Sequence, residues 1–308
     1  MLSLPQRFPT WLFPIIFLLP QCQPLPEVTD LSTIVADTES IPGRTEYLNS
    51  PFVTAGDRVY MVGHQNGQFP DLGWHVVGEM GGIWDHPIKL MDGFTASITS
   101  NGQSFCLAEA DTFINYPFAN LHVYASTPVD LRVERFQFVP DGKEAVVVQY
   151  TFTNQSEEAQ TIAFDFTGYA DLRPVWLGER TNMQDTTDVA TWNEALDGWV
   201  AKDSLNAWYT LFGSSTPSQS HTLQESKHCQ YEPKGQGVVA SIRYSLNIPA
   251  GAAVHLPITI AGSYQSQKAA EATYAEVQQR AKGLLQTKKE RYQTIADKSK
   301  LTIPDKNL

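Results

Sequence analysis

The chain has 308 residues and a formal net charge of −11, with 42% hydrophobic and 18% charged residues. These values are typical of a globular protein and argue against disorder. Binding of nucleic acid irrespective of sequence needs clustered Lys and Arg, so the acidic balance excludes nucleic acid as an expected partner.

Residues 1–22 have the pattern of an export signal. Arg7 precedes an apolar run, Trp11–Leu19, which is too short to span a bilayer and has the length of a signal-peptide core. Cys22 follows Leu-Leu-Pro-Gln and resembles the lipidated cysteine of bacterial lipoproteins, although Gln21 is bulkier than the usual residue there. We expect an exported protein anchored through lipid on Cys22, periplasmic or at the cell surface. The alternative is a plain secretory signal and a secreted or periplasmic protein.

The segment 23–45 begins with a proline-rich stretch and is predicted to be a tether. Two further cysteines, Cys106 and Cys229, follow in the body of the chain. An exported protein can oxidise them to a disulfide, but two separate buried thiols fit the sequence equally well.

Residues 46–264 are predicted to form a large antiparallel β-supersandwich. Apolar residues alternate with period two in several runs bounded by Gly, Pro, Asn and Asp. The clearest runs are Val146–Phe152, Ile162–Phe166, Val238–Leu246 and Val254–Ile260. Sheets with one packed face alternate in this way, and no stretch between Gly56 and Gly262 is typical of a long helix.

Residues 265–308 are predicted to form a linker helix that leads to a further domain. From about Gln267 to Lys298 an apolar stripe recurs at helical spacing, formed by Tyr274, Val277, Ala281, Leu284, Tyr292 and Ile295. The other face is charged, with Lys282, Lys288, Lys289, Glu290 and Arg291. Such a stripe needs a partner, either the sandwich itself or a neighbouring domain.

Chemistry-bearing residues are concentrated in the glycine-rich segment Gly63–Phe94. It contains three histidines, four acids and two tryptophans: His64, His75, His86, Asp71, Glu79, Asp85, Asp92, Trp74 and Trp84. A metal site is one interpretation, but the spacing matches no closed motif. A second is a carboxylate pair for glycoside hydrolysis. A third is a loop whose tryptophans stack on a sugar ring, and the fourth is a structural loop with buried tryptophans.

A second patch, Asp171–Arg180, offers Trp176 for stacking, and Arg173 and Arg180 for hydrogen bonds to hydroxyls. The alternative for these arginines is a structural ion pair with a nearby acid. The chain contains no G-x-S-x-G nucleophile motif, no G-x-G-x-x-G after a strand and no phosphate-binding loop, so no cofactor is predicted.

Four features in order resemble the N-terminal region of bacterial glycogen-debranching and glucoamylase-like glycosidases. They are the loop Gly63–Phe94, the strands VVVQYTFTNQSEEAQTIAFDF leading into DLRPVW, the late strands IPAGAAVHLPITIAG, and the helix ending KKERYQTIADKSKLTIPD. The resemblance implies a β-supersandwich that precedes an (α/α)6 catalytic barrel. It also implies that the inner helices of that barrel carry the general acid and base, so no catalytic residue and no metal ligand is assigned in this chain.

By the same resemblance, loops of the sandwich line the rim of the barrel's pocket. The residues expected there are Trp74, His75, Trp84, Asp85 and His86, with Trp176 as a further candidate. The expected partners are carbohydrate and a helical-barrel catalytic domain, in the same chain or a separate one. The expected function is that of a non-catalytic domain of an exported glycosidase acting on glucan, and the alternative is a stand-alone glycan-binding lipoprotein.

Overall fold

The structure is a computed structural model that describes residues 28–176, 178–224, 227–232 and 235–298. These residues are mainly β and form two antiparallel sheets of nine and eight strands, with one α-helix. The fold class predicted from the period-two runs is therefore confirmed. The proposed signal and Cys22 lie outside the described residues. Within those residues, none of the helices combines the length and the hydrophobicity that a membrane span requires.

The nine-stranded sheet runs in the order β1-β7-β8-β9-β10-β17-β14-β13-β12. Its strands are β1 (Ile41–Pro42), β7 (Thr112–Tyr116), β8 (Ala119–Tyr124), β9 (Leu131–Phe138), β10 (Ala145–Asn154), β17 (Ala253–Ser263), β14 (Tyr209–Ser214), β13 (Gly198–Asp203) and β12 (Asp188–Asn193).

The eight-stranded sheet runs in the order β15-β16-β11-β5-β4-β3-β2, and β6 pairs with β5 beside this path. Its strands are β15 (Ser220–Thr222), β16 (Val238–Ile248), β11 (Gln160–Ala170), β5 (Ile88–Ser100), β4 (Gly82–Asp85), β3 (Val59–His64), β2 (Pro51–Ala55) and β6 (Gln103–Cys106). The remaining elements are the 3-10 helices η1 (Leu31–Val35), η2 (Thr45–Tyr47) and η3 (Gly178–Thr181), and the helix α1 (Gln267–Lys298).

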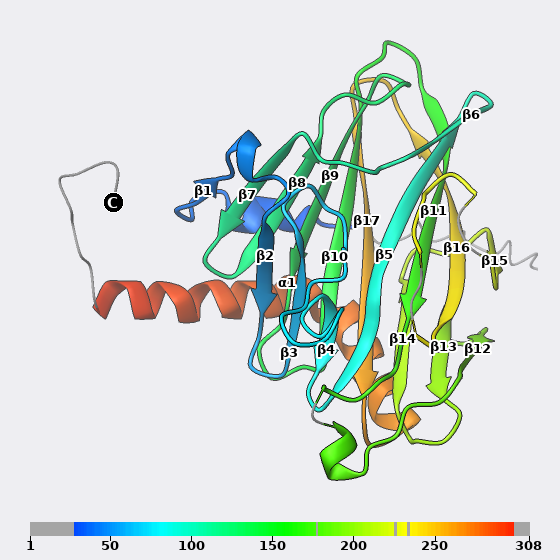
Figure 1. Ribbon diagram of the computed structural model, residues 1–308. Helices are drawn as coiled ribbons and strands as arrows, with labels where there is room; N and C mark the ends of the chain where they lie inside the picture. Colours follow the sequence, from blue (N-terminus) through cyan, green and yellow to red (C-terminus); the bar gives the residue numbers. More distant parts are fainter. Residues whose placement is uncertain (1–27, 177, 225–226, 233–234, 299–308) are drawn as a thin grey trace, which may run out of the picture.

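Strand β10 lies in the middle of the nine-stranded sheet (Figure 1). Its alternate residues pack in two different cores. Val146, Val148 and Phe152 pack in the main core between the two sheets. Val147 points to the opposite face, where a second core lies beneath α1 and η1. Both faces of this sheet are therefore covered, which explains why β10 is buried along nearly its whole length.

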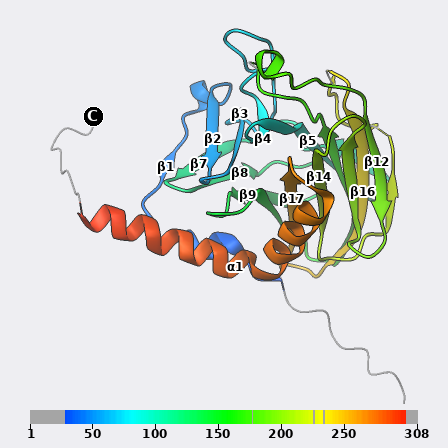
Figure 2. The same cartoon turned by 90° about the horizontal axis from the view of Figure 1, so that it is seen from below.

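The first turns of α1 pack against the outside of the nine-stranded sheet (Figure 2). Tyr274 is 1% exposed and lies over Gly198 and Gly213, where the sheet surface has no side chains. A Cβ atom at Gly213 would lie only 2.4 Å from the Tyr274 hydroxyl oxygen, so glycine is needed for this close approach. The predicted apolar stripe is thus covered by the sandwich itself over the first half of the helix.

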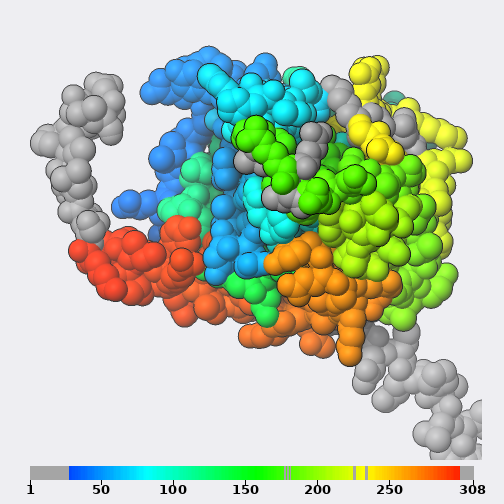
Figure 3. Space-filling model, turned by 60° about the horizontal axis from the view of Figure 1, so that its bottom comes forward, coloured from blue at the N-terminus to red at the C-terminus, as the bar shows by residue number. Residues whose placement is uncertain are grey.

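The last turns of α1 project from the body of the molecule, where they form the red extension in Figure 3. Ile295, the final residue of the predicted stripe, is 53% exposed. Lys288, which the sequence analysis assigned to the charged face opposite the stripe, is only 1% exposed and is therefore buried. Its Nζ donates hydrogen bonds to the Ala55 carbonyl oxygen at 2.9 Å and to Asp141 Oδ1 at 2.7 Å, which satisfy the buried ammonium group.

The prediction that residues 23–45 form a tether is wrong for most of this segment. Residues 28–45 belong to the fold, since Leu31 and Val35 are buried in the second core and β1 pairs with β7. Gln149 holds this segment in place: its Oε1 accepts the Leu31 N–H at 2.7 Å and its Nε2 donates to the Thr29 carbonyl at 2.8 Å. The apolar residues of this stretch are too few and too irregularly spaced to produce a periodic signal in the sequence.

Candidate functional site

The glycine-rich segment Gly63–Phe94 begins in β3, forms a loop over 65–81, and returns through β4 into β5. The loop leaves the sheet and carries exposed aromatic residues, whereas the strands take their side chains into the core. The structure therefore divides the predicted rim residues into two groups, one on the surface and one inside.

Trp74 and His75 belong to the surface group, and the structure brings His75 beside Trp176. Trp74 is 86% exposed and Trp176 is 50% exposed. The ring centroids of His75 and Trp176 lie 5.2 Å apart with an angle of 31° between the ring planes. We call these three residues the aromatic platform. Two segments far apart in the chain, both singled out from the sequence, thus meet on one surface.

The carboxylate of Glu79 fixes the backbone of the platform. Its Oε1 accepts the N–H groups of Trp74 at 2.7 Å and His75 at 2.6 Å, and its Oε2 accepts that of Val76 at 3.2 Å. These hydrogen bonds, that of His75 above all, lower the pKa of Glu79. Glu79 was considered as one acid of a hydrolytic carboxylate pair, but in the structure its carboxylate stabilises the backbone of the loop.

Arg173 anchors the loop from behind. Its Nη2 donates to the Gly78 carbonyl oxygen at 2.9 Å, and the buried Lys89 Nζ donates to the same oxygen at 3.2 Å. Arg173 Nε lies 3.0 Å from Asp171 Oδ2, so the structural ion pair foreseen as the alternative for this arginine is present. Arg180, the other candidate for bonding hydroxyls, is exposed.

A cluster of buried charges underlies this anchor. Lys89 Nζ is hydrogen-bonded to Asp92 Oδ1, and both side chains are almost fully buried. Burial raises the pKa of Asp171 to about 7 and that of Asp188 to about 8. Asp188 Oδ2 also accepts the Leu172 N–H at 2.7 Å. The cluster lies in the interior and joins β5 to the segment that carries Trp176.

The interior group contains Trp84 and Asp85, whose expected place on the rim is wrong. Trp84 is 1% exposed, and its indole N–H donates to the Gly81 carbonyl at 2.9 Å, so neither face of the ring is open for stacking. Asp85 is fully buried, and neither carboxylate oxygen has a hydrogen-bond partner in the described part of the chain. Burial, the largest cause, raises the pKa of Asp85 to about 7.

His86 is exposed, and its ring contacts Tyr60 and Trp84 rather than the aromatic platform. Its Nε2 is 3.0 Å from the Tyr60 hydroxyl oxygen, and its ring stacks on those of Tyr60 and Trp84 at centroid distances of 5.4 and 5.8 Å. Trp84 and Asp85, which precede it on β4, are both buried, and β4 lies in the interior of its sheet between β3 and β5. The sequence did not predict β4, because the strand is only four residues long and lies in a glycine-rich segment.

A pocket of about 560 Å³ is lined in part by the loop that carries Trp74 and His75, since Asp71 belongs to its wall, and the sequence did not reveal it. Gly67–Asp71 form one wall, Phe94–Ala96 and Cys106–Ala108 another, and His228 with Gln230–Glu232 a third. Arg135 and Tyr150, both almost fully buried, lie at its inner end. The pocket combines residues from six separate parts of the chain, which no local pattern can bring together.

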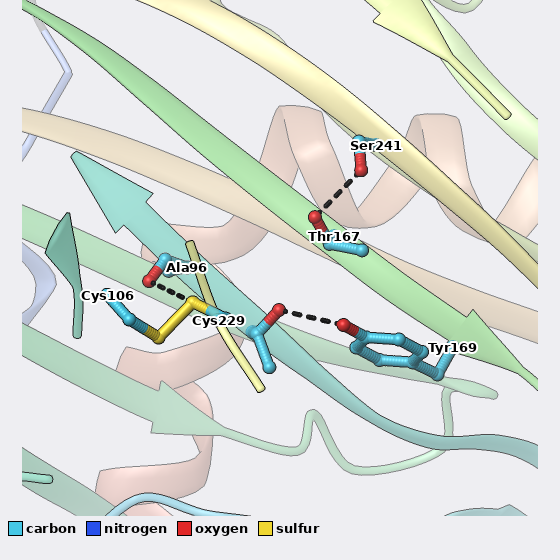
Figure 4. The surroundings of a disulfide bond; sticks show 7 residues. Ala96, Cys106, Thr167, Tyr169, Cys229 and Ser241 are labelled. Carbon is cyan, nitrogen blue, oxygen red and sulfur yellow. Dashed lines mark hydrogen bonds between the residues drawn. A yellow bond between two sulfur atoms is a disulfide. The ribbon is translucent and has the colours of Figure 1, made fainter. Parts of the chain in front are cut away.

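A disulfide between Cys106 and Cys229 ties the third wall to the sheet (Figure 4). Cys229 Sγ also lies 3.2 Å from the carbonyl oxygen of Ala96 on β5. Two residues further on, the Tyr231 ring stacks on Tyr169 at a centroid distance of 3.9 Å. Of the two alternatives left open by the sequence, the structure contains the disulfide, and it fixes a segment that has little regular structure of its own.

The aromatic platform offers aromatic stacking and hydrogen bonding to a ligand. Among the described residues, no group of three or more His, Cys, Asp or Glu side chains is arranged to hold a metal ion. The acids Asp85 and Asp92, considered with Glu79 for hydrolysis, are buried, and Glu79 is occupied by backbone N–H groups.

No protein-family model matches the chain, and no curated protein matches it. Solved structures similar in fold include a bacterial glucoamylase complexed with acarbose, 9% identical with a TM-score of 0.47 over 81% of this chain. A GalM/aldose epimerase homologue from C. elegans is 9% identical with a TM-score of 0.42 over 70% of this chain. A protein described as a kojibiose phosphorylase from human microbiome is 7% identical with a TM-score of 0.43 over 85%.

The share of each neighbour that is covered differs widely. This chain covers 38% of the glucoamylase and 36% of the phosphorylase, but 99% of the epimerase homologue. At these identities and TM-scores the likeness identifies neither the substrate nor the activity of this chain.

Proposed function

We propose that this chain is a non-catalytic domain of an exported glycoside hydrolase acting on glucan-type polysaccharide or oligosaccharide, and that the aromatic platform contacts the glycan. The observation that carries the proposal is the meeting of His75 and Trp176 beside the highly exposed Trp74. Exposed tryptophans gathered at one place on a soluble protein are typical of a binding surface.

The platform suits a sugar ring for physical reasons. A pyranose presents C–H groups on its faces and hydroxyls around its edge, so an aromatic ring with one open face can cover the former. Because Glu79 and Arg173 hold the loop through backbone groups, the rings are positioned before the ligand arrives. Such preorganisation reduces the entropy lost on binding.

Calorimetric titration of the full chain with maltohexaose tests the proposal. We expect binding by the native chain, and a loss of affinity on the order of tenfold or more in the double variant Trp74→Ala/Trp176→Ala. Leu205→Ala is the matched control, because Leu205 is a large apolar residue that is 60% exposed outside the platform. Equal affinity of the native chain and the double variant would exclude the platform as the binding surface.

In this proposal the hydrolytic acids belong to a helical-barrel domain, in the same chain or a separate one, and the platform forms part of its rim. The buried or occupied state of Asp85, Asp92 and Glu79 supports a non-catalytic role. Product analysis after incubation of this chain alone with maltohexaose tests that role. We expect no release of reducing ends, and clear turnover would contradict it.

A stand-alone surface lipoprotein that binds glycan without hydrolysis is the second candidate. It is favoured by the presence of the platform and the pocket in one sandwich. The reading frame that follows the codon for Leu308 distinguishes the two candidates. Paired amphipathic helices there would support the glycosidase, and unrelated sequence would support the stand-alone module.

A further inference from the structure

We propose that the pocket beside the platform is a second glycan subsite, which takes an uncharged saccharide unit with Arg135 at its inner end. The inference rests on the proposed function only for the class of ligand. Its location and its preference for an uncharged ligand follow from the residues that line the pocket.

The positive charge of the buried Arg135 side chain is not neutralised by a neighbouring acid in the described part of the chain. The side chain is 3% exposed, and Nη1 donates to the Gly67 carbonyl oxygen at 3.0 Å. In the described ranges, Nε and Nη2 make no hydrogen bond and no acid forms an ion pair with the guanidinium group. A buried cation in this state is costly, and a ligand that supplies oxygen acceptors would offset part of that cost.

Aromatic rings surround the guanidinium group and form the apolar part of the pocket. Its central carbon lies 5.8 Å from the centroid of the Phe69 ring and 5.2 Å from that of Phe94. The two rings contact each other with centroids 4.7 Å apart. Together with Tyr231 they give the pocket walls that suit the C–H faces of a sugar.

The backbone at Gly67 is shaped to allow this approach. Its φ is +94°, in the region that favours glycine, and a Cβ atom there would lie 2.6 Å from the Tyr124 hydroxyl oxygen and 3.3 Å from Arg135 Nη2. A glycine at this position therefore lets the loop of the platform reach the inner end of the pocket.

The outer end of the pocket carries acceptors. Glu232 and Gln230 are exposed, and Asp71 is half-buried three residues before Trp74. The Glu232 carboxylate at the outer end opposes the charge of the guanidinium group at the inner end, and the whole chain has a net charge of −11, so the pocket disfavours an anion. Sugar hydroxyls can both donate to the oxygens of Gln230 and Glu232 and accept from a guanidinium group, so an uncharged saccharide fits both ends.

The volume and position of the pocket indicate a chain longer than one sugar. About 560 Å³ lies within the range of small-ligand pockets. Asp71 belongs to the pocket wall and Trp74 to the platform, so a bound oligosaccharide would place its end in the pocket and its next units on the platform. The two sites would then act as subsites of one groove.

An occluding substitution tests the inference without touching the core. Ala108 lines the pocket and is exposed, so Ala108→Trp adds bulk at the opening, and Ala108→Ser is the matched control. We expect Ala108→Trp to lower calorimetric affinity for maltotriose on the order of tenfold, and Ala108→Ser to leave it unchanged. Tri-galacturonic acid, an anionic probe of similar length, should bind less tightly than maltotriose, and tighter binding of it would overturn the charge argument.

The variants separate this inference from the proposed function. Unchanged affinity in Ala108→Trp, with loss in the Trp74→Ala/Trp176→Ala variant, would overturn the pocket as a subsite and leave the platform in place. Loss in Ala108→Trp with no change in the platform variant would support the pocket and contradict the platform. Absence of maltotriose and maltohexaose binding by the native chain would overturn both.

Discussion

Cys106 and Cys229 are joined by a disulfide that spans 123 residues and holds the end of β6 against one wall of the pocket. Cys229 lies between the wall residues His228 and Gln230, so the bond acts directly on the shape of the pocket. Disulfides persist in oxidising compartments, which is the environment that the proposed export signal would give this chain.

Removal of the disulfide should destabilise the protein. Because a loop of this length closes at a large entropic cost, we expect reduction to lower the free energy of unfolding by about 2–5 kcal/mol. Urea unfolding with and without dithiothreitol measures the change. The Cys106→Ala/Cys229→Ala variant should show no response to reductant, and an unchanged midpoint in the reduced native chain would contradict the structural role of the bond.

Truncation of Tyr274 should test how α1 is held. The side chain is 1% exposed over Gly198 and Gly213, so we expect Tyr274→Ala to cost about 3–5 kcal/mol of unfolding free energy. Ile295→Ala, in the projecting turns of the same helix, should change it by less than about 0.5 kcal/mol. Chemical denaturation measures the unfolding free energy of both variants. Similar losses of unfolding free energy would show that the last turns of α1 are packed as tightly as the first.

Asp85 should make stability depend on pH. Its pKa is raised from 3.8 to about 7 in the folded protein, so the folded state holds the proton more tightly than the unfolded state. The native chain should therefore lose stability as pH rises from 4 through 7, because the buried carboxyl group must ionise.

Asp85→Asn removes this ionisation. The unfolding free energy of the variant relative to that of the native chain should rise by about 2–3 kcal/mol between pH 5 and pH 8, as measured by urea unfolding. Asp297→Asn, at an exposed acid near the end of α1, provides the control. A stability difference that stays constant across this pH range would show that Asp85 does not titrate as its burial implies.

Cys22 should carry the membrane anchor. If residues 1–22 are a lipoprotein signal, labelled palmitate should be incorporated into the native chain in a bacterial host and should disappear in Cys22→Ser. Detergent should be needed to extract the native chain from membranes but not the variant. Incorporation that survives the substitution, or none in either chain, would favour the plain secretory signal.

The sequence predicted strands and faces better than connections. Val146, Val148 and Phe152 lie on one core face as their alternation indicates. The strands β10 and β11, although separated only by a short polar turn, lie in different sheets, as do β16 and β17. Alternation shows which face is buried but not which sheet a strand joins, because that choice depends on pairings between residues far apart in the chain.

The candidate site shows the same division. The sequence selected the right segment, since Gly63–Phe94 provides two of the three platform residues, Trp74 and His75, and one wall of the pocket. It did not separate the exposed Trp74 from the buried Trp84, because both stand among glycines and acids. Arg135 gave no signal at all, since a single arginine in a strand is ordinary until its buried neighbours are known.

The most direct test of the account is a titration of the indole N–H resonances with maltohexaose in ¹⁵N-tryptophan-labelled protein. We predict that the signals of Trp74 and Trp176 shift in a saturable way, while those of the buried Trp84, Trp199 and Trp208 stay in place. Assignment by single Trp→Phe variants identifies each signal. Saturation with no movement of the Trp74 and Trp176 signals, or no shift of any signal, would contradict the proposal that the aromatic platform binds glycan.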